Sequence, residues 1–211
     1  MSVLKNSWSS FSRSIAKVYL DGYGHPSEKS KFLVASLLRE IFGKKPFRLA
    51  DFGCGNGHLC ELFMRRDLSC EYFGYDFSTS LLEAGRERYV GNSRVHFKEA
   101  DISDPESEIE KCDIVLYSHV FEILQSPEKS LHAARRVAPL VMIRFFEPPV
   151  GAHDIVELRQ MEVGDGASVP YLRRQISADY YNLILNKVGC RSVDVHQVDG
   201  DKDQVHVLRF D

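Results

Sequence analysis

The residues best suited to bind a ligand are three glycines that follow a short apolar run, Phe47–Phe52. Gly53, Gly55 and Gly57 form the pattern Gly-x-Gly-x-Gly. Glycine lets the backbone approach a ligand closely and tolerates positive φ. The apolar run predicts a strand, and ligands of open α/β sheets bind beyond the carboxyl ends of such strands. The glycines are therefore a candidate binding loop, with an ordinary structural turn as the alternative.

Two aspartates follow the next two predicted strands. Asp76 ends the apolar run 70–75. A carboxylate there can accept hydrogen bonds from both hydroxyls of a ribose, although a helix dipole would also favour it. Asp101 follows the run 95–98 and could accept a hydrogen bond from an adenine amino group while Ile102 packs on the ring. By itself, Asp101 would be read as an ordinary turn aspartate.

A histidine lies where the fourth predicted strand ends. His119 follows the run 112–117 and Ser118. Because an imidazole titrates near neutral pH, His119 is a candidate general base. The alternative is a hydrogen-bonded histidine at a strand end that takes no part in proton transfer.

A sheet is needed to bring these residues together, and the sequence alternates short β-rich runs with helical stretches, as α/β folds do. Strands are predicted at 47–52, 70–75, 95–98, 112–117 and 140–146. Helices are predicted at 7–20, 27–42, 58–67, 78–89, 126–137 and 177–188. An Asp-Gly turn between two alternating runs predicts a closing antiparallel hairpin over 192–198 and 204–210.

Taken in order, these motifs resemble those of class I S-adenosylmethionine-dependent methyltransferases. The resemblance rests on LADFGCGNG at 49–57, GYDFS at 74–78, ADI at 100–102 and DIVLYSHVF at 113–121. It covers residues 47–146, and the closing helix and hairpin more loosely. It implies an α/β fold, a Rossmann-like three-layer sandwich whose seven-stranded, mostly parallel sheet has an antiparallel last strand.

The resemblance also implies a cofactor, S-adenosylmethionine, with S-adenosylhomocysteine as the product and no metal. The cofactor-binding residues that it implies are Asp51, Gly53, Cys54, Gly55, Gly57, Asp76, Phe77, Asp101, Ile102 and Ser118. In this arrangement the glycine loop wraps the methionine part and Asp51 supports it. Asp76 holds the ribose, and Phe77 and Ile102 contact the adenine.

The acceptor side is expected in segments outside this core. We interpret the chain as one domain, with an N-terminal helical lid (1–46), the cofactor-binding core (47–146), a substrate-side insert (147–174) and the closing helix and hairpin (175–211). The insert is irregular, apart from a helical stretch expected near 154–161, and long loops of this kind are usually functional or disordered. The substrate-side candidates are Tyr19, Tyr23, Arg159, Arg173 and Arg174.

Each of these candidates has a second interpretation. The arginines could pair with an acidic group of the acceptor, since a guanidinium fork matches carboxylates and phosphates, or they could belong to a solvated charged turn. The two tyrosines could touch the cofactor or the acceptor, or they could simply pack in the lid.

Composition narrows the class of protein further. The 211 residues suit one domain. A net charge of −3, from 27 Lys and Arg against 30 Asp and Glu, argues against a protein whose main role is to bind nucleic acid. Five cysteines without a Cys-x-x-Cys pair favour reduced thiols in a cytoplasmic protein. Neither a signal peptide nor a membrane span is expected.

The expected function is methyl transfer to an oxygen or nitrogen of a small-molecule metabolite or biosynthetic intermediate. The methyl group of a sulfonium is already activated, so the enzyme would act mainly by alignment, with possible base assistance from His119. Two alternatives stay open: an RNA or protein methyltransferase, and a non-catalytic cofactor-binding subunit that activates a partner. A nicotinamide oxidoreductase fits less well, because the third glycine of its fingerprint is misplaced.

Overall fold

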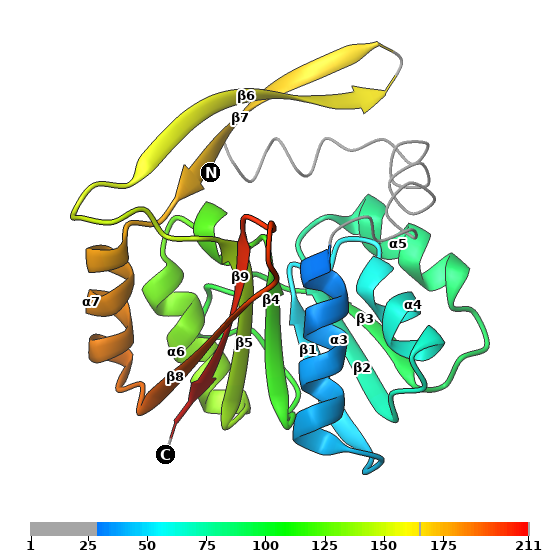
Figure 1. Ribbon diagram of the computed structural model, residues 1–211. Helices are drawn as coiled ribbons and strands as arrows, with labels where there is room; N and C mark the ends of the chain where they lie inside the picture. Colours follow the sequence, from blue (N-terminus) through cyan, green and yellow to red (C-terminus); the bar gives the residue numbers. More distant parts are fainter. Residues whose placement is uncertain (1–28, 165, 211) are drawn as a thin grey trace.

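The computed structural model of the chain describes residues 29–164 and 166–210. Tyr19, Tyr23 and the helix expected at 7–20 lie outside these residues. Within them, one seven-stranded sheet has the strand order β3-β2-β1-β4-β5-β9-β8. Neighbouring strands from β3 to β5 run parallel, whereas β9 runs antiparallel to both β5 and β8 (Figure 1). The predicted sheet with an antiparallel last strand is therefore confirmed.

The elements lie close to where the sequence predicts them. The strands of the large sheet are β1 (Phe47–Phe52), β2 (Cys70–Asp76), β3 (Val95–Glu99), β4 (Ile114–Ser118), β5 (Leu140–Phe146), β8 (Ser192–Gln197) and β9 (Asp203–Arg209). The helices are α3 (Lys29–Phe42), α4 (His58–Arg65), α5 (Thr79–Arg88), the short 3₁₀ helix η1 (Phe121–Ile123), α6 (Pro127–Val137) and α7 (Ala178–Val188). Gly189 ends α7 in the left-handed conformation, as its position after the apolar periodicity predicts.

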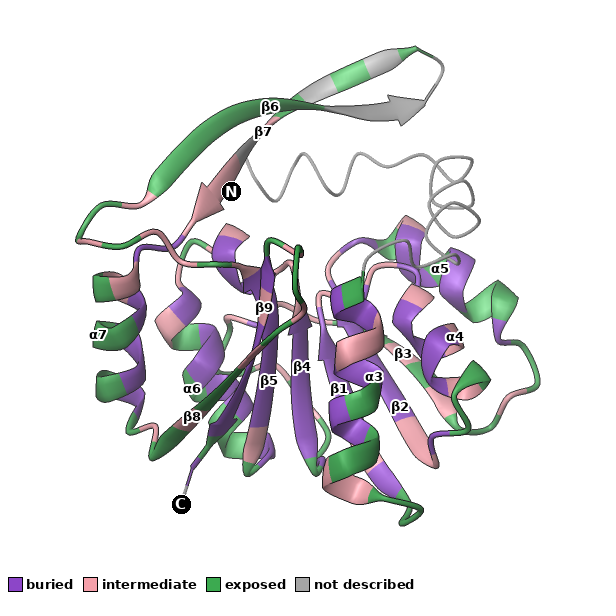
Figure 2. Ribbon diagram, viewed as in Figure 1, coloured by how far each residue is buried: buried purple, intermediate pink, exposed green. Residues whose placement is uncertain are grey.

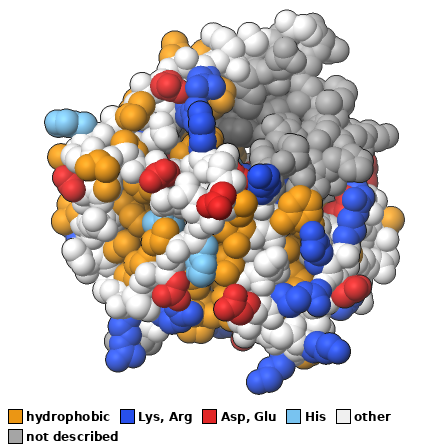
Figure 3. Space-filling model, viewed as in Figure 1, with side chains coloured by type: hydrophobic (Ala, Val, Ile, Leu, Met, Phe, Trp, Pro, Cys, Tyr) orange, Lys and Arg blue, Asp and Glu red, His pale blue; other side chains and the backbone are white. Residues whose placement is uncertain are grey.

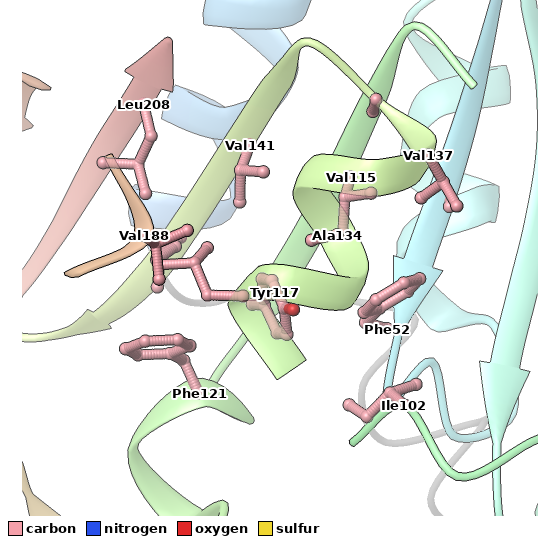
Figure 4. Close-up of a cluster of buried hydrophobic side chains, with 14 of the residues drawn as sticks. Phe52, Ile102, Val115, Tyr117, Phe121, Ala134, Val137, Val141, Val188 and Leu208 are labelled. Carbon is pink, nitrogen blue, oxygen red and sulfur yellow. The ribbon is translucent and has the colours of Figure 1, made fainter. Parts of the chain in front are cut away.

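Helices cover both faces of the sheet, because side chains along each strand alternate between the two faces. In β1, Leu49 packs into a core with α3, α4 and α5. Its neighbours Ala50 and Phe52 pack on the opposite side with α6 and α7. Figure 4 shows this second core, where Val115 of β4 lies against α6. The result is the expected three-layer sandwich.

The segment after β5 differs from its prediction. No helix forms near 154–161; instead β6 (Ile155–Gly164) pairs antiparallel with β7 (Ala167–Gln175). The partner strand, which lies elsewhere in the sequence, supplies the backbone hydrogen bonds. Such pairing overrides the weak helical preference of residues 154–161. Figure 1 shows the hairpin arching over the end of the sandwich at which β1, β2 and β4 finish.

The surface of the described residues carries charges of both signs and some exposed apolar side chains (Figure 3). Figure 3 shows basic and acidic side chains interspersed over one face. Figure 2 shows β6 exposed near the base of the hairpin, where Ile155, Val156 and Leu158 are exposed apolar residues. None of the helices among the described residues is long and apolar enough to cross a membrane.

Candidate functional site

The glycine loop joins β1 to α4 in a conformation that side chains would prevent. Gly53 and Gly57 have φ of 73° and 76°. A Cβ on Gly53 would lie 2.6 Å from a methyl of Val120, and one on Gly57 would lie 2.6 Å from the ring of Phe97. The amide of Gly53 donates to the carbonyl of Tyr75 at 2.7 Å, which ties the loop to the end of β2.

Asp76 is the carboxylate that faces this loop. Its Oδ2 accepts a hydrogen bond from the amide of Gly55 at 2.8 Å, and its Oδ1 accepts one from the amide of Ser78 at 2.9 Å. Burial raises the pKa of Asp76, and hydrogen bonds from the amides of Ser78, Gly55 and Phe77 oppose this rise. The carboxylate is therefore held in one orientation between the loop and the start of α5.

A pocket of about 280 Å³ opens beside Asp76 at the carboxyl ends of β1, β2 and β4. Five residues that the sequence predicts as cofactor-binding line it: Gly53, Asp76, Phe77, Asp101 and Ile102. The other lining residues are Ala100, Ser103, Val120, Ile123, Leu124, Gln125, Ser126 and Lys129. Sequence reasoning missed the wall formed by 120–126, although its place after the fourth strand was a usable signal.

Five other predicted cofactor residues lie outside the lining of this pocket: Asp51, Cys54, Gly55, Gly57 and Ser118. Asp51 accepts a hydrogen bond from the hydroxyl of Tyr72 at 2.7 Å in the buried core. Cys54 is buried against Gly74, and Ser118 accepts a hydrogen bond from Arg144 through its hydroxyl at 3.0 Å. Gly57 begins α4. Cofactor contacts by these five residues stay predictions.

Asp51 gives a prediction about stability. Burial raises its pKa to about 7, and the hydrogen bond from Tyr72 lowers it only in part. The folded protein therefore retains this proton between about pH 4 and pH 7, where the unfolded chain loses it. Stability that Asp51 contributes in acid is therefore lost progressively as the pH rises from about 4 to 7.

We expect Asp51→Asn, which carries no charge and can still accept from Tyr72, to gain stability relative to the wild type as the pH rises. The gain between pH 4.5 and pH 8 should be on the order of 3 kcal/mol. Urea unfolding of both proteins at the two pH values measures it. A stability difference that does not change with pH would contradict the assigned proton.

His119 lies at the end of β4, in a cluster of buried charges. Its Nδ1 lies 2.7 Å from Glu122 Oε1 and its Nε2 lies 3.1 Å from Asp203 Oδ2. The same Asp203 oxygen accepts hydrogen bonds from Arg144 Nη2 at 2.7 Å and from the hydroxyl of Ser30 at 2.7 Å. Residues from α3, β5, η1 and β9 thus meet at His119, directly after β4.

The pKa values of this cluster reflect its pairing. Burial would lower the pKa of His119, but hydrogen bonds to Asp203 and Glu122 outweigh it and raise the pKa. Burial would raise the pKa of Asp203, but its contacts with His119, Arg144 and Ser30 lower it to about 2. The arrangement therefore favours a positively charged His119 between two carboxylates.

The three predicted arginines are all engaged within the protein. Arg159 pairs with Glu157 at 2.8 Å on the exposed hairpin. Arg173 lies over the ring of Phe146, 4.0 Å from its centre. Arg174 donates to the carbonyls of Glu122 and Leu124 at 2.9 and 2.6 Å, which fastens β7 to η1. Contacts between any of them and an acceptor stay predictions.

The part of the chain that holds this site resembles a known protein family. Residues 50–139, which include the glycine loop, Asp76, Asp101 and His119, match the family described as methyltransferase domain. By this match, residues 50–139 are a methyltransferase domain. The chain is 35% identical over 104 residues to a trans-aconitate 2-methyltransferase from Rhodopseudomonas palustris, and the match covers 49% of this chain and 38% of that protein.

A demethylmenaquinone methyltransferase from Clavibacter sepedonicus is also 35% identical, over 36% of this chain and 32% of that protein. The chain thus spans less than two fifths of the length of these curated relatives.

Solved structures resemble the chain over more of its length. The CcbJ methyltransferase from Streptomyces caelestis has a TM-score of 0.68 at 16% identity. The match covers 96% of this chain and 97% of the CcbJ chain. An amino pentose methyltransferase from Micromonospora echinaspora, solved with S-adenosylmethionine bound, has a TM-score of 0.67 at 16% identity over 92% of this chain and 97% of that one. At this identity the likeness is one of fold.

Proposed function

We propose that the methyltransferase domain binds S-adenosylmethionine in the pocket beside Asp76 and transfers its methyl group to a small-molecule acceptor. The observation that carries the proposal is the Asp76 carboxylate, fixed by the amides of Gly55 and Ser78 at the wall of a pocket that Asp101 also lines. Relatives that act on trans-aconitate and demethylmenaquinone support a small acceptor.

The residues of the pocket suit the parts of this cofactor. Asp76 would accept hydrogen bonds from the ribose hydroxyls, because a carboxylate offers two oxygens to two donors. Ile102 and Phe77 offer apolar surface for the adenine ring, and Asp101 offers an acceptor for its amino group. The glycine loop leaves backbone within reach of the methionine part.

When bound, the cofactor supplies an electrophilic methyl group on a positively charged sulfur. The acceptor atom, an oxygen or a nitrogen in our proposal, forms a bond to that methyl as the carbon–sulfur bond breaks, and S-adenosylhomocysteine is the second product. The protein contributes by aligning the two partners and excluding water. A proton leaves the acceptor in the same reaction or before it.

His119 is the residue that the sequence suggests as the base for this proton, and its contacts weigh against that role. A base needs a free ring nitrogen, whereas Nδ1 and Nε2 of His119 both lie on carboxylates. Its raised pKa also favours the protonated form. We therefore propose a reaction that proceeds mainly by alignment.

Calorimetric titration of the folded protein with S-adenosylhomocysteine tests the cofactor part of the proposal, with NAD⁺ as the contrasting ligand. We expect saturable binding of the first and none of the second. Transfer of radiolabelled methyl from S-adenosylmethionine to a panel of small hydroxyl and amine compounds then tests the catalytic part. Absence of cofactor binding would overturn the proposal, and binding without any product would favour an activator subunit.

A further inference from the structure

The turn after β4 has two chemically different sides. His119 and Glu122 stand three residues apart, and their side chains contact each other on one side of the turn. The residues between and after them, Val120, Ile123 and Leu124, line the cofactor pocket. One side of this turn is thus a wall of the proposed cofactor site, and the other is held by buried charges.

On the buried side of this turn, Glu122 depends on His119 for a positively charged partner. Glu122 is almost completely buried, and its Oε2 has no hydrogen-bond partner among the described residues. Its other oxygen contacts His119, which links it to Asp203 on β9. A buried carboxylate of this kind is costly unless a positive partner faces it. His119 is that partner for Glu122, whereas Arg144 serves Asp203.

The backbone at His119 is also unusual. Its φ of 54° lies in the left-handed region, which residues other than glycine rarely adopt. Such conformations persist where surrounding contacts enforce them, and they cluster at functional sites. Here the enforcing contacts are the two carboxylates and a hydrogen bond from the His119 amide to the carbonyl of Arg144 at 2.9 Å.

The turn also supports the binding loop directly. Val120, the residue after His119, fills the space at Gly53 so closely that a Cβ there would lie 2.6 Å from one of its methyl groups. A shift of His119 away from Asp203 would therefore change how Val120 packs on the glycine loop. In this way the last strand of the sheet is connected to the cofactor pocket.

We propose that His119 is a positioning residue: bridging Glu122 and Asp203, it clamps the wall of the cofactor pocket against β9. This inference rests on the proposed function, because it assigns His119 to the support of that same pocket. It differs from a base role in a measurable way, since a clamp acts on cofactor affinity in the absence of any acceptor.

The clamp and the base predict opposite effects of pH. The groups that face the His119 ring are Glu122 on η1, Asp203 on β9 and Arg144 on β5. Arg173 of β7 lies over the ring of Phe146, which His119 also contacts. Because the carboxylates raise the pKa of His119, the clamp is complete below that pKa and is lost as the pH rises through it. A base would instead gain activity over the same range and leave cofactor affinity unchanged.

The experiment is calorimetric titration of S-adenosylhomocysteine between pH 6 and pH 10 into the wild type, His119→Gln and the control His132→Gln, which changes an exposed histidine on α6. We expect His119→Gln to bind about tenfold more weakly than the wild type near neutral pH. The wild type and the control should lose affinity as the pH rises. The ligand's own amino group also titrates in alkali, so the clamp is measured by the part of this loss that His119→Gln lacks.

Direct observation of the ring completes the test and does not depend on the variant folding. Nitrogen NMR of the wild-type histidines, with His119 assigned from the His119→Gln spectrum or by selective labelling, should show both of its ring nitrogens protonated at pH 7. A neutral His119 ring, or equal affinities and pH profiles for the wild type and His119→Gln, would overturn the clamp. Failure of the wild type to bind the ligand at any pH would overturn the proposed function instead.

Discussion

Replacing Asp76 with alanine is expected to reduce affinity for S-adenosylhomocysteine by about a hundredfold or more. Two hydrogen bonds from ribose hydroxyls to a charged carboxylate are lost, and each is worth about 1.5–3 kcal/mol. The amides of Gly55 and Ser78 also lose their acceptor, so the glycine loop is less well fixed. Calorimetric titration measures the affinity, and thermal unfolding checks that the variant is folded.

Asp104→Ala is the matched control for this variant. Asp104 is an exposed aspartate whose carboxylate accepts from the amide of Glu106, two residues on, at 2.9 Å. Asp76 accepts from Ser78 in the same local pattern, but only Asp76 lines the pocket. Asp104→Ala should bind the ligand like the wild type. An Asp76→Ala protein that is folded and binds as tightly as this control would remove the main support for the proposed function.

The pKa of Asp76 adds a pH dependence. Burial raises this pKa, and a protonated carboxyl is a weaker acceptor for the ribose. Cofactor affinity should therefore fall in acid, as the pH drops through the pKa of Asp76. Asp76→Asn should bind weakly at every pH and lack this acidic loss.

Replacing Gly57 with alanine is expected to destabilise the fold by about 3–5 kcal/mol. The added Cβ would lie 2.6 Å from Cζ of Phe97, well inside contact distance. Phe97 has little room to retreat, because Gly85 and Gly74 also approach its ring with no side chain between. Chemical unfolding of the ligand-free protein measures the loss.

Gly91→Ala separates the steric effect from the backbone effect. Gly91 has φ of 82°, close to the 76° of Gly57, but a Cβ there would meet nothing within 4 Å. It should therefore cost only the left-handed backbone penalty, about 1–2 kcal/mol. Adding Phe97→Leu should recover part of the loss in Gly57→Ala and none in Gly91→Ala. Equal losses for the two single variants would show that Phe97 is not the cause.

Local pattern was enough to predict most of the sheet and five of the thirteen residues that line the pocket. The strand at 140–146 and the helix ending at Gly189 follow from apolar periodicity and a terminating glycine, which act over a few residues. The glycines of 53–57 and Asp76 also follow from local rules, since only a particular turn after a buried strand needs them. Gly53 and Asp76 both line the pocket at the carboxyl edge of the sheet.

The hairpin of β6 and β7 could not be predicted in this way. Its strands depend on pairing between residues such as Ile155 and Gln175, which lie far apart in the sequence. A residue's helical preference over one or two turns carries no information about such a partner. The wall of the pocket at 120–126 was missed for a related reason. Which side of this turn faces the pocket depends on the elements packed against it, and these come from other parts of the sequence.

The sequence alone determined that a glycine loop and Asp76 would meet at one end of a mostly parallel sheet, because backbone sterics and strand periodicity are local properties. Only the tertiary structure decided the state of His119. Its partner Asp203 lies 84 residues away on β9, and Arg144 comes from β5. The charge of a buried imidazole depends on the groups packed around it, so a histidine that the sequence suggests as a base is surrounded in the fold by the partners of an imidazolium.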